Sequence, residues 1–302
     1  MIFGELCDTI FALCKNKNDT KLHSEELEAE IFSLSKTELI PLVSNAGIIP
    51  ESIAHDSSEE KLFTKATEII LAKCFQELGL KAETIKTRSG CADVSAKSRF
   101  HNYSLVADAK AFRLSRTAKN QKDFKVEAMD SWRKEADYAV LACPYFQYPK
   151  KASQIYEQAI TRNVLLFSWE YIRFLLENDI AENEKIDLSF VWNQSAFIAH
   201  SITADKIQNR FLEAQDKNIV LQLGLEYRNF LSALKKDKEE IICRSEKEIA
   251  YWQKKRNEIQ SYTREKAVSE LISSLKINEK ISAIESFSVS LMEEDLEKNN
   301  DE

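Results

Sequence analysis

The spacing of apolar residues along the first half of the chain changes from a helical period to a strand-like one. Apolar side chains recur at helical spacing from Leu62 to Cys74, after the sequence Ser-Ser-Glu-Glu at positions 57–60, and the pattern stops at Gly79. A similar start, Ser35 followed three residues later by Glu38, precedes a second helical pattern. Ser at the N-cap with Glu at N3 is a capping box, so the sequence predicts helices that begin at both places.

The segments beyond Gly79 alternate between short apolar runs and helical patterns. The order predicted from these patterns is three strands, a helix, a strand, a helix, a strand and a helix, at 80–87, 92–96, 103–109, about 117–134, 138–143, 153–161, 163–167 and 168–176. This order predicts an α/β fold with a mixed sheet flanked by helices.

The chain beyond about residue 185 reads as almost wholly helical. Its longest part, 238–274, is charged and amphipathic with a sparse apolar seam. We therefore divide the chain into an N-terminal helical segment (1–50), an α/β core (51–180) and a helical C-terminal region (181–302). The last region is either a second domain or a layer of helices wrapped around the first.

The composition of the 302 residues, 44% hydrophobic and 30% charged, is that of a soluble globular protein. No apolar run is long enough to span a bilayer, and the N-terminus lacks the pattern of a secretory signal. The six cysteines are scattered singly, without the pairing typical of a zinc site, and favour reduced thiols in the cytoplasm. The low glycine and proline content, 5 Gly and 4 Pro, favours a helix-rich fold.

A local basic run interrupts this acidic chain, whose net charge is −7. A positive charge occurs at every third position from Lys110 to Lys125, with one acid, Asp123, among them. The run follows directly on the predicted strand 103–109. Such a run in an acidic protein indicates one basic cleft for phosphate, not a general coat of nucleic acid.

Three polar residues of this region suit phosphodiester hydrolysis. Side chains two apart on a strand share a face, so Asp108 and Lys110 emerge together where the strand ends, and hairpin pairing brings Asp93 of the preceding strand close to Asp108. Paired carboxylates repel each other, and a hard divalent ion such as Mg2+ relieves that repulsion. Lys110 then orients the attacking water or stabilises charge in the transition state.

The tripeptide Asp-x-Lys alone is a weak signal, because an ordinary surface salt bridge explains most of its occurrences. It occurs three times, beginning at Asp19, Asp108 and Asp123. Only the copy at Asp108 ends an apolar strand and follows an acid on a neighbouring strand. We therefore take that copy as the candidate active site.

This arrangement resembles the PD-(D/E)XK nuclease superfamily, and within it the type II restriction endonucleases. The closer resemblance rests on Val-Ala-Asp-Ala-Lys at 106–110 and on the segments 112–126, 137–141, 146–149, 164–170, 60–63 and 71–73. It is strong over about residues 40–175 and looser in the helical remainder. One departure is Ala92, which stands where the superfamily's name has Pro.

The resemblance implies a Mg2+-dependent homodimer that cuts double-stranded DNA at the palindrome AAGCTT after the first A, leaving 5′ overhangs and 5′-phosphates. It implies that Asp93, Asp108 and the carbonyl of Ala109 ligate the metal and that Lys110 is catalytic. Glu60 is a further candidate for the site. Its alternative role is that of the reciprocal partner in the capping box at Ser57.

The basic run itself is a candidate DNA-reading segment. Charges three apart spiral around a helix, so either part of the run is a loop or the element lies deep in a groove and is contacted from several sides. Both fit DNA better than a solvated surface helix, the alternative explanation of such a run. Arg and Lys can bind guanine, Asn adenine, and Asp cytosine. We expect base contacts from Asn120, Lys122 and Asp123, and phosphate contacts from Arg113, Arg116, Lys119 and Lys125.

These features favour a sequence-specific, metal-dependent endonuclease. A nuclease of the same fold acting in recombination or repair, and a DNA-binding protein with a structural Asp/Lys pair, remain alternatives. A palindrome is read most simply by a two-fold dimer. The helices near Ile10–Phe32 and beyond residue 240 are candidate dimer interfaces, although a monomer's own core would explain their apolar stripes equally well.

Overall fold

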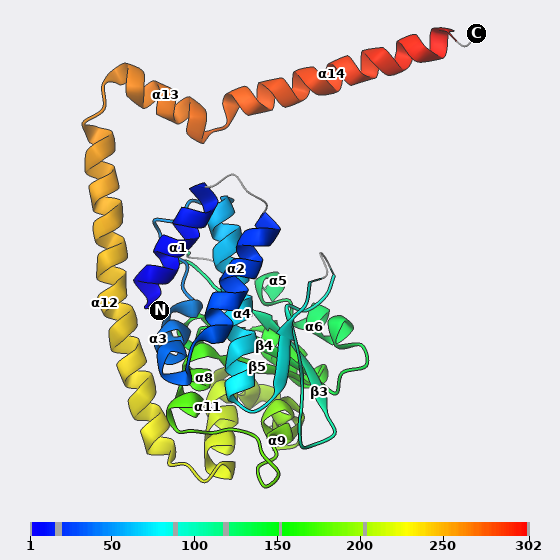
Figure 1. The fold of residues 1–302 in the computed structure, drawn as a ribbon, viewed down its shortest axis with the longest axis vertical. Coiled ribbons are helices and arrows are strands. Elements are labelled where there is room, and N and C mark those ends of the chain that lie inside the picture. The colour runs from blue at the N-terminus through cyan, green and yellow to red at the C-terminus, as the bar shows by residue number, and fades with distance from the viewer. Residues whose placement is uncertain are drawn as a thin grey trace. The chain divides into compact units, whose positions relative to one another are not determined.

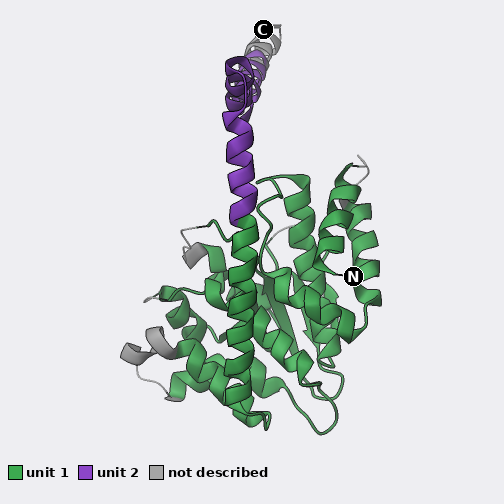
Figure 2. Ribbon diagram, turned by 90° about the vertical axis from the view of Figure 1, so that its left-hand side faces the viewer, with its two compact units in different colours: residues 1–248 green, residues 249–302 purple. Residues whose placement is uncertain are grey.

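The computed structural model describes residues 2–15, 20–86, 90–116, 121–150, 153–201 and 204–300 (Figure 1). The chain divides into two compact units, residues 1–248 and 249–302 (Figure 2). The boundary falls inside helix α12 (Tyr227–Gln260), so residues 181–248 belong to the unit that contains the sheet, unlike the division at 180 expected from sequence. The reason is that Trp192 and Phe211 of this stretch are buried in the core of the first unit.

The first unit is built on a five-stranded mixed sheet, which confirms the predicted fold class. Its strands are β1 (Lys81–Thr84), β2 (Val94–Lys97), β3 (Ser104–Ala109), β4 (Tyr138–Cys143) and β5 (Val164–Ser168), in that spatial order. Strands β1, β2 and β3 pair antiparallel, and β3, β4 and β5 pair parallel. The middle strand, β3, therefore joins the hairpin half of the sheet to the parallel half.

Helices cover both faces of this sheet (Figure 1). The successive side chains of β3 alternate between two apolar clusters: Leu105 and Ala107 belong to one, and Val106 belongs to the other. The first cluster includes residues of α1 (Phe3–Lys15), α2 (Thr20–Ser33), α3 (Lys36–Ala46), α4 (Ser58–Glu77), α8 (Trp169–Glu177) and α9 (Ser189–Trp192). The second includes residues of α5 (Gln121–Phe124), α6 (Val126–Arg133), α7 (Gln154–Thr161) and α10 (Gln194–Ser201), and α11 (Ala204–Gln222) contributes to both.

Two helix starts predicted from sequence are confirmed. The capping box at α3 is complete, with the Ser35 N–H donating to Glu38 Oε2 over 2.9 Å. At α4, Ser57 Oγ accepts from the Glu60 N–H over 3.1 Å. The helix ends before Gly79, whose φ of 93° is in the left-handed region and where a Cβ would lie 2.5 Å from the backbone oxygen of Glu182. The predicted boundary at Gly79 therefore reflects both conformation and close packing.

The helix expected over about 117–134 is interrupted. Helices α5 and α6 are separated by Lys125, whose φ of 51° and ψ of 33° are left-handed. Phe124 and Val126 are both buried in the same cluster. An uninterrupted helix would turn these two side chains about 200° apart, so the left-handed residue allows both to reach the core.

The second unit is helical. It contains the end of α12, α13 (Arg264–Ser274) and α14 (Ile277–Asn300). None of the residues of α13 is buried, and Leu271, Ile284 and Phe287 are 58%, 66% and 63% exposed. These helices thus present large apolar side chains to solvent. Within the described ranges, no helix is sufficiently long and apolar to cross a membrane.

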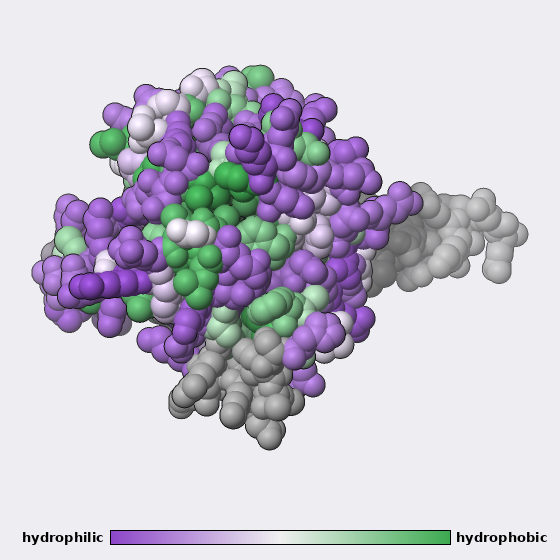
Figure 3. All heavy atoms as spheres, turned by 90° about the horizontal axis from the view of Figure 1, so that it is seen from below, coloured by the Kyte–Doolittle hydropathy of each residue, from purple (hydrophilic) through white to green (hydrophobic). Residues whose placement is uncertain are grey.

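Figure 3 shows one face of the molecule, which is mostly hydrophilic with apolar side chains gathered near its middle.

Candidate active site

The hairpin of β2 and β3 brings two aspartates together. Val94 lies opposite Ala107, and the N–H of Asp93 continues the ladder by donating to the Ala107 carbonyl over 3.0 Å. Asp93 therefore lies just before the first residue of β2, and it lines the same cavity as Asp108 of β3. The carboxylate oxygen Oδ2 of Asp93 also accepts from the Ala109 N–H over 2.8 Å. The structure thus places side by side the two carboxylates that the strand pattern predicted to meet.

Lys110 stands at the end of the middle strand and forms an ion pair with Asp108. Its backbone is fixed on both sides, because its N–H donates to the Ala142 carbonyl over 2.7 Å and its carbonyl accepts from Trp169 Nε1 over 3.0 Å. Asp108 is 2% exposed, and its buried Oδ2 is the oxygen that pairs with the Lys110 ammonium. Carboxylate oxygens are the ligands that a hard cation such as Mg2+ prefers.

Burial and neighbouring negative charge dominate the electrostatics here. Burial, followed by the charges of Asp108 and Glu68, raises the pKa of Asp93 to about 8. The Ala109 N–H and the Lys110 ammonium act in the opposite direction. Ionising both aspartates is therefore costly until positive charge is added, and a divalent ion coordinated by oxygen supplies that charge. The residues present fit Mg2+ on the chemistry of their donor atoms.

Glu68 is a third carboxylate at this place that the sequence interpretation missed. It lies on α4 and lines a cavity of about 440 Å³ together with Lys65, Asp93, Asp108 and Lys125. Burial raises the pKa of Glu68, and a hydrogen bond from Lys65, whose Nζ lies 2.6 Å from Glu68 Oε2, offsets only part of that rise. The sequence did carry one signal for Glu68, because it is an acid within an apolar stretch of the predicted amphipathic helix.

Glu60, the helix-borne acid singled out from sequence, points to different partners. Its Oε1 accepts from Arg113 Nη2 over 2.6 Å, and its Oε2 accepts from the Asp56 N–H over 2.7 Å. With His55 and Asp56 it forms the one group among the described residues in which three candidate ligand atoms lie within 4.8 Å of one another. Both carboxylate oxygens of Glu60 are already engaged, so its contacts support the reading segment and the start of α4.

Arg113, the first arginine of the predicted DNA-reading segment, has a largely buried side chain. Arg113 donates from Nη1 to the Pro50 and Ile53 carbonyls over 2.9 and 2.7 Å, and its side chain is only 14% exposed. A phosphate cannot reach a guanidinium that is occupied in this way without displacing those partners. The structure therefore gives Arg113 an anchoring position where the sequence pattern predicted a phosphate contact.

The remaining residues of the segment differ in their accessibility. Arg116 is 38% exposed, pairs with Asp123 over 2.7 Å and lies over the Phe112 ring. Lys125 is exposed, with Nζ 5.4 Å from the centre of the Trp132 ring, and it lines the cavity that holds the two aspartates. Lys119 and Asn120 lie outside the described residues, and Lys122 is described only in its backbone, in α5.

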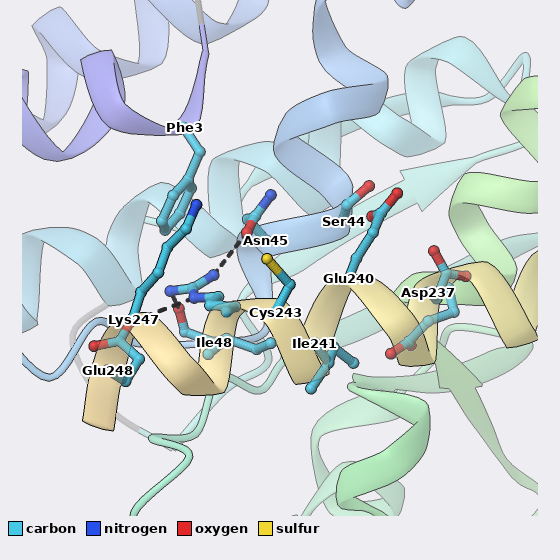
Figure 4. Close-up of a pocket in the computed structure, with 12 residues that line it drawn as sticks. Phe3, Ser44, Asn45, Ile48, Asp237, Glu240, Ile241, Cys243, Lys247 and Glu248 are labelled. Atoms are coloured by element: carbon cyan, nitrogen blue, oxygen red, sulfur yellow. Dashed lines mark hydrogen bonds and ion pairs between the residues drawn. The ribbon is translucent and has the colours of Figure 1, made fainter. Parts of the chain in front are cut away.

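A short loop after α3 holds the reading segment in place. Glu51 accepts from the N–H and the hydroxyl of Ser115, both over 3.0 Å. The Glu51 N–H in turn donates to Glu248 of α12 over 3.0 Å. Arg244 of α12 donates to Asn45 Oδ1 and to the Ile48 carbonyl over 2.7 and 2.8 Å, and Figure 4 shows Asn45 and Ile48 facing that helix. The segment is thus anchored through this loop to α12.

A mixed sheet with paired carboxylates and a lysine at the end of its middle strand is consistent with the PD-(D/E)XK nuclease fold. A family model, the HindIII restriction endonuclease, matches residues 5–288, and the chain belongs to this family. The chain is 40% identical over 282 residues to the type II restriction enzyme HindIII of Haemophilus influenzae, an alignment that covers 93% of this chain and 94% of that protein.

Proposed function

We propose that this protein is a type II restriction endonuclease that makes Mg2+-dependent double-strand cuts in DNA at AAGCTT, after the first A, and leaves 5′ overhangs with 5′-phosphates. The observation that carries the proposal is the site formed by Asp93, Asp108 and Lys110 in a chain of the HindIII family. The recognition sequence and the cut position are those that the resemblance implies, and the 40% identity to HindIII supports carrying them over to this chain.

The two aspartates and the Ala109 carbonyl would hold Mg2+, which when bound neutralises charge on the scissile phosphate and lowers the pKa of a coordinated water. Asp93 is preoriented by the Ala109 N–H, so one carboxylate keeps its position at the strand end. Lys110 holds a largely buried ammonium beside Asp108, where it stabilises negative charge that develops on the phosphate. Glu68, held by Lys65, adds a carboxylate to the same cavity.

The DNA-reading segment is proposed to act through the residues that follow Arg113. Base contacts are assigned to Asn120, Lys122 and Asp123, and phosphate contacts to Arg116, Lys119 and Lys125. Arg113 is proposed instead to position the segment, because its guanidinium binds Pro50, Ile53 and Glu60. Lys125 borders the cavity of the aspartates, which supports its assignment to a phosphate near the cut.

A homodimer fits the reading of a palindrome, with one active site for each strand. The exposed apolar side chains of α13 and α14 support the second unit as the dimer interface, because such faces are normally covered. By contrast, Ile10 and Leu27 of the N-terminal helices are fully buried within their own chain. The proposed place of action is the cytoplasm, where host and foreign DNA meet the enzyme.

Incubation of plasmid DNA with the protein in Mg2+, in EDTA, and as the Asp108→Asn variant tests the proposal. We expect linear product only from the unmodified protein in Mg2+, because Asn retains the shape of Asp but provides one neutral oxygen to the cation. Cleavage that persists in EDTA or in the variant would contradict the metal-dependent mechanism.

A further inference from the structure

A groove separate from the DNA-reading segment opens between α2, α4 and the end of β1. Its volume is about 610 Å³. Four of its ten lining residues are lysines and two are glutamates: Lys21, Lys61, Lys65, Lys86, Glu25 and Glu28. The chain as a whole has a net charge of −7, so the excess of lysine here opposes the overall charge. A concave basic surface on an acidic protein attracts a polyanion locally.

This groove continues from the candidate active site. Lys65 and Ile85 line both the groove and the cavity that holds Asp93 and Asp108. Lys61 lies one turn before Lys65 on α4, about 6 Å along the helix axis. Lys86, which follows β1, lines the same groove beside Glu28 of α2. A chain of phosphates leaving the active site would therefore meet ammonium groups in succession.

We propose that this groove binds the sugar–phosphate backbone of double-stranded DNA just outside the recognition sequence. The inference rests on the proposed function, since the scissile phosphate fixes where the backbone enters. Lysine is suited to this role as a flexible point charge that needs no fixed geometry. The contacts would carry no sequence information and would set the register of the duplex over the two aspartates.

The two glutamates do not block the groove, because their ion pairs are weak. Lys86 lies 3.5 Å from Glu28, and Lys21 lies 3.9 Å from Glu25, with lysine side chains 67% and 73% exposed. Such pairs contribute little to stability and can exchange a carboxylate for a phosphate. Glu28 is also held by the Thr84 hydroxyl over 2.6 Å, so it keeps a partner when Lys86 moves to DNA.

The test is the salt dependence of DNA binding in EDTA, where the proposed reaction does not proceed. Two duplexes are used: one ends close to AAGCTT, and the other extends a full helical turn on each side. The Lys61→Ala/Lys86→Ala variant is compared with the unmodified protein and with Lys97→Ala, an exposed lysine at the end of β2 away from Asp93. All three substituted lysines are exposed, so the variants are expected to fold.

On the long duplex, the slope of log K against log salt should become shallower in the double variant by roughly 0.9 for each lysine removed from a phosphate. On the short duplex, the double variant and the unmodified protein should give the same slope, and Lys97→Ala should match the unmodified protein on both. Equal slopes on the long duplex for the double variant and the unmodified protein would overturn the inference. Plasmid cleavage by the unmodified protein, assayed in parallel, tests the proposed function separately.

Discussion

A substitution of Arg113 distinguishes a structural role from a DNA-binding role, because the charge pattern predicts a phosphate contact and the structure gives an anchoring position. Its guanidinium donates to the Pro50 and Ile53 carbonyls and pairs with Glu60. In the Arg113→Ala variant these three acceptors lose their donor. The side chains of Arg113 and Glu60 are only 14% and 17% exposed, so water replaces the lost contacts incompletely.

Removal of one partner from a buried ion pair costs about 3–5 kcal/mol, and partial exposure places this pair toward the lower value, about 3 kcal/mol. The matched variant Arg116→Ala breaks a more exposed pair, with a side chain 38% exposed, and should cost about 1 kcal/mol or less. The assay is urea unfolding of the DNA-free protein followed by tryptophan fluorescence, since Trp169 and Trp192 are buried in the first unit. If Arg113→Ala unfolded at the same urea concentration as the unmodified protein but bound DNA with a shallower salt slope, the reasoning would be refuted.

Three further predictions concern the active site, the second unit and the core. Glu68→Gln should lower the rate of Mg2+-dependent cleavage by at least about tenfold while Glu59→Gln on the same helix leaves it unchanged, and equal rates for the two variants would remove Glu68 from the site. Ile284→Glu combined with Phe287→Glu should shift the sedimenting species from dimer to monomer, and a persistent dimer would place the interface elsewhere. Burial raises the pKa of Glu170 to about 7 from 4.5, so this carboxyl favours folding at low pH and its contribution is lost as the pH rises from about 4.5 to above 7. Glu170→Gln should therefore flatten the fall in unfolding free energy over that range, and a slope identical to that of the unmodified protein would exclude the effect.

The local elements of this fold could be predicted because their determinants are close in sequence. The capping residues Ser35 and Ser57 mark the starts of α3 and α4 as predicted. The proximity of Asp93 and Asp108 followed from strand alternation and a hairpin between adjacent strands, both of which are short-range rules. The first half of the site was therefore accessible from the sequence.

What could not be predicted depends on partners that are distant in sequence. A charge pattern shows that Arg113 is basic but not that Pro50, Ile53 and Glu60 surround it. The left-handed conformation of Lys125 arises because Phe124 and Val126 are both drawn into the core, a tertiary demand that helix periodicity does not contain. Tertiary packing in this way divided the basic run into an anchored part and an accessible part.

Glu60 and Glu68 show the same limit within one helix. Both are acids on α4, and the sequence favoured Glu60 because it lies in the first turn. Only the placement of α4 against the sheet decides which of them faces the aspartates, and that placement brings Glu68 to the cavity. Helical periodicity identified the element, while long-range packing selected the residue.

Sequencing the ends of plasmid DNA cut in Mg2+ tests the central claim most directly, because it reports the sequence, the position of the cut and the overhang together. Every cut should lie after the first A of AAGCTT on both strands, with 5′-phosphates on four-base overhangs. Cuts at unrelated sequences, or intact plasmid in the presence of Mg2+ and folded protein, would contradict it.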